Sequence, residues 1–128
     1  MKHNFKNLKI WNLAMEIALD IHKATQDFPK HELYGLSSQL NRAAVSMASN
    51  IAEGSNRGNN YFLHFLNISL GSSFEVQTQI LIAHQNNYLD NDKAKAIEDK
   101  LDEFQKMMTG FINKLEGTHQ VLFLVSRL

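Results

Sequence analysis

The chain has 128 residues, with 13 Lys or Arg balanced by 13 Asp or Glu and a pI near 7.0. This length fits one domain, and the balanced charge excludes a general attraction to nucleic acid or anionic membranes. The absence of cysteine excludes disulfides, thiolate nucleophiles and cysteine-based zinc sites. No signal-peptide pattern and no membrane-spanning apolar run is present, so we expect a cytoplasmic protein without a membrane partner.

Helical periodicity runs through the chain, and we expect one domain over residues 1–128 that contains four helices. The first helix is expected over about 8–27, where apolar residues recur every three or four positions. It should end at Phe28, because a following proline disfavours helical backbone. The second helix is expected over about 33–55, before a cluster of glycine and asparagine residues.

The third helix is expected over about 60–87, with Gly71 in its middle. A glycine at such a position costs about 1 kcal/mol relative to alanine, so we expect close packing there as compensation. The fourth helix is expected over about 92–116, with Asp90 or Asp92 as its N-cap. Four amphipathic helices with short connections predict an all-α, up-down-up-down four-helix bundle.

The C-terminal region is expected to differ from the helices before it. Gly117 is predicted to cap the fourth helix, followed by an apolar tail over residues 118–128. Residues 121–125 are five consecutive apolar residues, a pattern that favours aggregation when it is exposed. We therefore expect the tail either to pack on its own bundle or to dock on a neighbouring subunit.

Charge is scarce in the middle of the chain. Over residues 33–89 only Arg42, Glu53, Arg57 and Glu75 are ionised. An average sequence of this length holds roughly fourteen charges. Long helices with so few charges are expected to be covered on several sides, in the bundle core and against partner subunits.

The second helix carries a polar stripe opposite its leucine face, made mostly of small residues. At 100° per residue the stripe spans about a third of the circumference and contains Ser38, Arg42, Ser46, Ser49, Asn50, Glu53 and Arg57. We expect Arg42 and Glu53 to find partners such as Glu75 or Arg57 on a facing helix. The stripe is either a hydrogen-bonded seam at a helix or subunit interface, or a binding site built from Arg42, Asn50, Glu53 and Arg57.

The sequence lacks the motifs that are typical of catalytic sites in such bundles. The chain lacks the two Glu-x-x-His pairs of a carboxylate-bridged di-iron bundle, any His-x-x-x-His pair, and the lysine-containing glycine loop that binds phosphate. We therefore expect no catalytic residue, no metal, no cofactor and no enzymatic activity.

Several motifs resemble those of the 23S rRNA intervening sequence proteins. They are Phe28-Pro29, Glu32-Leu33-Tyr34-Gly35-Leu36, Asn50-Ile51-Ala52-Glu53-Gly54, Gly71-Ser72 with Glu75, and Asn87-Tyr88-Leu89. The resemblance extends to about Leu115 and implies a left-handed bundle assembled into a homopentameric ring, without established enzymatic activity. It also implies a relation to the accessory proteins of diversity-generating retroelements, which bind nucleic acid and a reverse transcriptase.

Two functions of different classes follow. The first is a non-enzymatic, oligomeric scaffold or adaptor, whose partners are further copies of itself and another protein. The second is an RNA- or DNA-binding ring, associated with ribosomal RNA insertions or a reverse transcriptase. In that ring, phosphate contacts from Lys2, Lys6, Lys9, Arg42 and Arg57 of several subunits add up.

Overall fold

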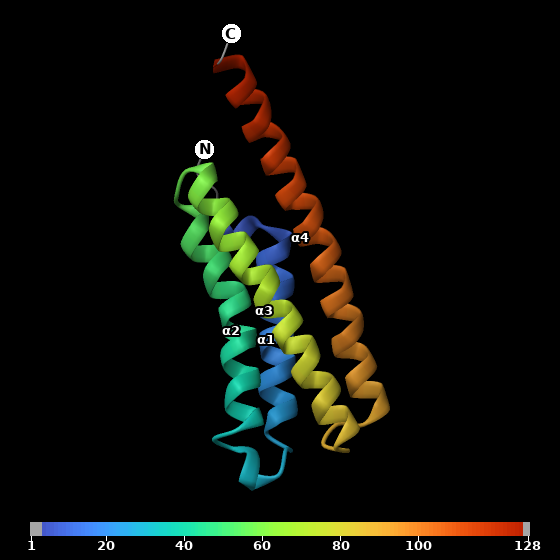
Figure 1. Ribbon diagram of the computed structural model, residues 1–128. Coiled ribbons are helices and arrows are strands. Elements are labelled where there is room, and N and C mark those ends of the chain that lie inside the picture. The colour runs from blue at the N-terminus through green and yellow to red at the C-terminus, as the bar shows by residue number, and fades with distance from the viewer. Residues whose placement is uncertain (1–3, 127–128) are drawn as a thin grey trace.

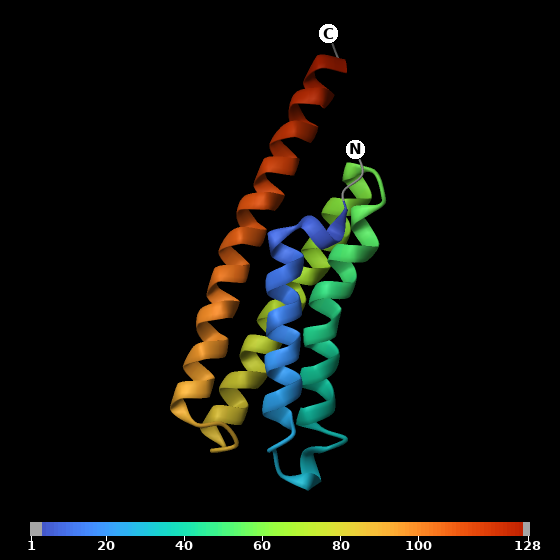
Figure 2. The same cartoon turned by 180° about the vertical axis from the view of Figure 1, so that it is seen from behind.

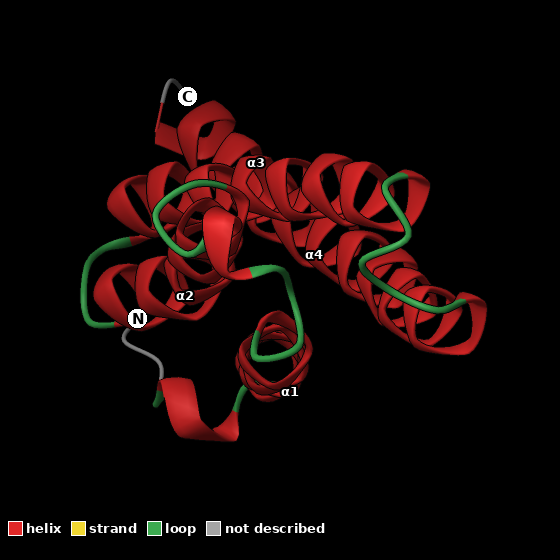
Figure 3. Ribbon diagram, turned by 90° about the horizontal axis from the view of Figure 1, so that it is seen from below, coloured by secondary structure: helices red, strands yellow, loops and turns green. Residues whose placement is uncertain are grey.

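The computed structural model describes residues 4–126, with side chains described for residues 4–117. The described chain is all-α, as predicted, and contains α1 (Lys9–Thr25), α2 (Leu36–Ser55), α3 (Asn59–Gln85) and α4 (Asn91–Ser126). Each helix packs against its neighbours in the chain, and α1 also packs against α4. The colour gradient in Figure 1 shows successive helices running in opposite directions, and Figure 3 shows short loops at their ends. The left-handed twist stays a prediction.

The second helix begins at Leu36 instead of Leu33. After Pro29 the chain forms a short 3₁₀ helix, η2 (Lys30–Glu32), and Gly35 precedes the first helical residue. The Oε1 atom of Glu32 accepts a hydrogen bond of 3.3 Å from the backbone N–H of Leu36. This carboxylate accepts a hydrogen bond from one of the backbone N–H groups that have no partner within the helix. The bond favours a helix that begins at Leu36, three residues later than hydrophobic periodicity predicts.

The connection between α3 and α4 is set by local capping. Asn87 has φ of 60°, and the N–H of Tyr88 donates to the Ala83 carbonyl at 2.9 Å, which is the bond pattern of a Schellman cap. Asparagine tolerates this left-handed conformation better than other non-glycine residues. Asp90 then caps α4, since its Oδ1 accepts from the N–H of Lys93 at 2.8 Å.

Helix α4 does not end at Gly117, so the predicted C-cap there is wrong. The helix continues to Ser126, and no described glycine has a positive φ. One exposed glycine costs a helix only about 1 kcal/mol, and no proline follows it to stop the helix. Figures 1 and 2 show the end of α4 projecting beyond the other three helices. The side chains of the predicted tail, residues 118–128, lie outside the described residues.

One apolar core runs through the bundle. Its fully buried large side chains come from all four helices: Ile17, Ile21, Leu40, Met47, Ile51, Phe62, Leu66, Val76, Ile80, Leu101, Phe104 and Met108. Successive positions on each helix are three, four, seven or ten residues apart, which keeps them on a single helix face. Within the described part of the chain, no helix combines the length and apolar character needed to cross a membrane.

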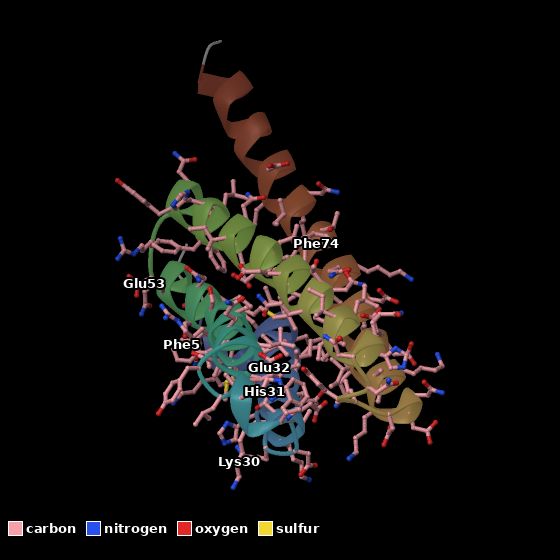
Figure 4. The ribbon with its side chains drawn as sticks, turned by 60° about the horizontal axis from the view of Figure 1, so that its bottom comes forward. Phe5, Lys30, His31, Glu32, Glu53 and Phe74 are labelled. Atoms are coloured by element: carbon pink, nitrogen blue, oxygen red, sulfur yellow. The ribbon has the colours of Figure 1, made fainter. Side chains whose placement is uncertain are left out.

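Polar contacts join the elements around this core. The Tyr88 hydroxyl donates to Glu32 Oε2 at 3.0 Å, and its ring packs on Phe28 with centroids 5.6 Å apart. The hydrogen bond to Glu32 raises the pKa of Tyr88. Between α1 and α4, Lys100 Nζ donates to Asp20 Oδ2 at 2.6 Å, and this contact raises the pKa of Lys100. Figure 4 shows Glu32 in the α1–α2 connection, far from Glu53 near the other end of α2.

Candidate interaction surface on helices α2 and α3

The outward surfaces of α2 and α3 form one continuous face, because these helices are packed side by side. We define the α2–α3 face by its exposed residues, which repeat at helical spacings. They are Arg42, Val45, Ser49 and Glu53 from α2, with Tyr61, His64, Ile68, Gly71, Glu75 and Ile82 from α3. The only ionised side chains of the two helices, Arg42, Glu53 and Glu75, all lie on this face.

Small polar side chains hold the two helices together beneath this face. The Ser46 and Ser72 hydroxyls are 2.9 Å apart, and Asn50 Nδ2 donates to the Ser46 carbonyl at 2.8 Å and to its Oγ at 2.9 Å. Deeper in, Ser69 Oγ donates to the Met47 carbonyl at 2.7 Å. Ser46 and Asn50 of the predicted stripe therefore form a hydrogen-bonded seam between helices. No sequence pattern predicted Ser72 as the partner of Ser46.

Glu53 and Arg57 pair with each other along the chain and not across facing helices. Arg57 Nη2 lies 2.6 Å from Glu53 Oε1, and the guanidinium carbon lies 5.2 Å from the centre of the Phe65 ring. Both side chains are about half exposed. The spacing of four residues brings them together at the end of α2, so each charge is matched within the chain.

Arg42 and Glu75 are exposed and have no such match. Among residues 4–117, neither side chain lies within 4.0 Å of an opposite charge or makes a side-chain hydrogen bond. The expected pairing of Arg42 with Glu75 on the facing helix therefore does not occur within one chain. Each remains available to a group outside it.

The close approach of α2 and α3 occurs at Gly54 and not at Gly71. A Cβ atom on Gly54 would lie 2.7 Å from Phe65 Cβ and 3.0 Å from Phe62 Cδ1. A Cβ atom on Gly71 would meet nothing within 4 Å. The expectation of close packing at Gly71 is thus wrong for the single chain. Because Gly71 has no side chain, the backbone of α3 is accessible at the middle of the α2–α3 face.

Apolar side chains are exposed on this face, in contrast to the charged opposite side of the bundle. Val45 is 56% exposed, Ile68 39% and Ile82 46%. The outer surfaces of α1 and α4 instead carry many ionised residues, among them Glu16, Lys23, Lys95, Asp99 and Lys106. Single exposed apolar residues are normal, whereas several together on a face with few charges indicate an interaction surface.

The predicted phosphate contacts are only partly described. Lys6 and Lys9 are exposed, and η1 (Phe5–Asn7) packs against α2 near the end that carries Arg57. Figure 2 shows η1, in dark blue, at the end of the bundle that holds the α2–α3 connection. Lys2 lies outside the described residues. Arg42 is on α2 well away from this end, so the predicted basic residues do not form one cluster on a single chain.

A hollow of about 630 Å³ lies between the end of α1 and the start of α2, with His22, Tyr34 and Asn41 in its lining. Asn41 Nδ2 is already engaged, because it donates to Thr25 Oγ1 at 2.8 Å and to the Ser37 carbonyl at 2.9 Å. Across the described residues, no three His, Asp or Glu side chains are grouped to hold a metal ion.

Comparisons with known proteins agree with the resemblance seen in the motifs. The family model described as 23S rRNA-intervening sequence protein matches residues 6–110. A solved structure of a protein of unknown function from the S23 ribosomal protein family of Bacteroides thetaiotaomicron has a similar fold, with a TM-score of 0.75. The two sequences are 20% identical, and the match covers 81% of this chain and 95% of the other. No curated protein sequence matches this chain.

Proposed function

Because this chain belongs to the 23S rRNA-intervening sequence protein family, we propose that it is a non-enzymatic scaffold that assembles from several copies through the α2–α3 face. The observation that carries the proposal is the exposure of three aliphatic side chains, Val45, Ile68 and Ile82, together on one face of the bundle. Covering such side chains contributes about 25 cal/mol per Å² of apolar surface removed from water.

The proposed assembly is a closed ring of five copies, which offers repeated positions to a protein partner. In this ring the α2 side of one copy's face contacts the α3 side of the next copy's face, so every subunit uses the same two patches and none is left unpaired. The open position of Gly71 supports close contact, because a glycine on an exposed helix face lets another backbone approach. The charged surfaces of α1 and α4 remain in water in this arrangement.

Light scattering tests the assembly. The wild-type protein is expected to have a mass that is a multiple of 14.6 kDa at micromolar concentration. Ile68→Lys should lower this mass, because it buries a lysine charge in the proposed contact. Leu19→Lys is the matched control: Leu19 is also exposed, at 63%, but lies on α1, and its replacement should leave the mass unchanged. A wild-type mass of one chain would overturn the proposal.

Nucleic-acid binding is a second candidate, supported by the exposed Lys6 and Lys9 at the same end of the bundle as Arg57. In a ring these positions would be repeated around one rim. Binding to single-stranded RNA should weaken steeply with salt, and Lys6→Gln with Lys9→Gln should reduce the slope of log K against log salt. Changing Lys23 and Lys93 to glutamine at the opposite end is the control. Equal effects of the two pairs, or no binding at low salt, would exclude this site.

A further inference from the structure

Two opposite charges on the α2–α3 face have no partner among the described side chains, residues 4–117. Glu53 is matched by Arg57 at 2.6 Å, which leaves Arg42 and Glu75 as the unpaired ions of this face. Both are exposed, and neither makes an ion pair or a side-chain hydrogen bond with residues 4–117. A face that otherwise avoids charge thus retains one cation and one anion.

The two charges lie at a similar level of the bundle. The contact between Ser46 and Ser72 fixes the register of the two helices. Arg42 is four residues before Ser46, and Glu75 is three residues after Ser72. Since α2 and α3 run in opposite directions, both charges lie about one turn from the serine contact toward the same end of the bundle.

We propose that Arg42 of one copy pairs with Glu75 of a neighbouring copy and thereby sets how the α2 side of one face meets the α3 side of the next. This inference rests on the assembly proposed above. The face carries its unpaired cation on α2 and its unpaired anion on α3, so the α2 side of one copy is complementary to the α3 side of another, which identifies the occupant as this same chain. Covering the apolar residues around these charges removes water from both, so each needs an opposite charge across the contact.

The surroundings of the two residues favour such a pair. Gly71 lies one helical turn before Glu75, and a Cβ atom there would meet nothing within 4 Å, so a long arginine side chain from another copy has room to reach Glu75. An arginine binds a carboxylate through two parallel N–H donors, which fixes orientation as well as distance. The ion pair therefore selects one register between the two copies. The exposed isoleucines add apolar contact area, which does not select a particular register.

Charge reversal tests the pair. Arg42→Glu and Glu75→Arg should each weaken assembly about thirtyfold, because each places like charges in contact. The double variant, with both changes in one chain, should recover most of the loss. Sedimentation over a range of protein concentrations measures these effects, and Lys23→Glu on α1 is a charge-reversal control that should assemble as the wild type does. Thermal unfolding by circular dichroism verifies that every variant is folded.

Mixing the two single variants separates a pair between copies from a pair within one chain. A chain with Arg42→Glu presents two anions, and a chain with Glu75→Arg presents two cations, so every contact between the two kinds of chain joins opposite charges. A ring of five can then contain as few as one contact between like chains. Equal amounts of the two should therefore assemble better than either alone. A pair within one chain predicts no recovery on mixing, although the double variant would still recover.

Each outcome decides something different. Recovery both in the double variant and in the mixture supports the pair between copies. Recovery in the double variant alone, or in neither, overturns it while the assembly of the wild type stands. A wild-type protein that remains a single chain overturns the proposed assembly and, with it, this inference.

Discussion

Replacing Phe62 by alanine is expected to lower the free energy of unfolding by about 3–5 kcal/mol, the usual cost of removing a buried phenylalanine side chain. Phe62 is 0% exposed and packs edge-on against Phe111, with ring centroids 5.7 Å apart. It also lines the place where α2 and α3 come closest, at Gly54. Its removal leaves a cavity bounded by three helices, which rigid helix packing fills only in part.

Phe74→Ala is the matched control, since Phe74 lies on the same helix and is 50% exposed. Its loss should cost less than about 1 kcal/mol, because a half-exposed ring leaves no closed cavity. Urea unfolding followed by circular dichroism measures both variants at one protein concentration. Similar losses for the two phenylalanines would show that the core is not where the structure has it.

Gly54→Ala is expected to destabilise the protein by about 1–3 kcal/mol, although alanine is the better helix former. The new methyl group would lie 2.7 Å from Phe65 Cβ, an atom attached directly to the backbone of α3. That contact cannot be relieved by rotating a side chain, so α2 and α3 must move apart. The seam between Ser46 and Ser72 would then be strained as well.

Gly110→Ala is a control that should change the stability in the opposite direction. Gly110 is in α4, and a Cβ atom there meets nothing within 4 Å, so alanine should stabilise the helix by about 1 kcal/mol. A change of this size shifts the melting temperature by about 4 °C in a domain of this length. Thermal unfolding should therefore move the two variants in opposite directions. A higher melting temperature for Gly54→Ala would contradict the close approach.

The four helices could be predicted from the sequence because apolar periodicity and strong breakers coincide in this chain. Pro29 ends the first helical segment, and the glycines and asparagines around Asn56 end the second. The start of α2 could not be predicted so well, since it depends on a hydrogen bond from Leu36 to the Glu32 side chain. Gly117 misled the prediction because a glycine marks a helix end only where it adopts a positive φ.

The candidate site shows which pairings a sequence can predict. Helical spacing placed Ser46 and Asn50 on one stripe, but their partner Ser72 depends on the register between two helices, which periodicity does not contain. For the same reason the sequence could not distinguish a glycine facing a neighbouring helix, Gly54, from one facing solvent, Gly71. Local spacing can identify only contacts between residues about one helical turn apart, such as the ion pair of Glu53 with Arg57.

The three-residue connection between α2 and α3 has a consequence for synthesis of the chain. Every residue of the α2–α3 face comes from one continuous segment, residues 42–82, which closes on itself through residues 56–58. Bringing its two helices together costs little loop-closure entropy. Because a chain is synthesised from its N-terminus, both helices of this hairpin leave the ribosome before α4 does. The residues of the surface proposed for assembly are thus exposed to neighbouring chains before the last helix is available to cover the core.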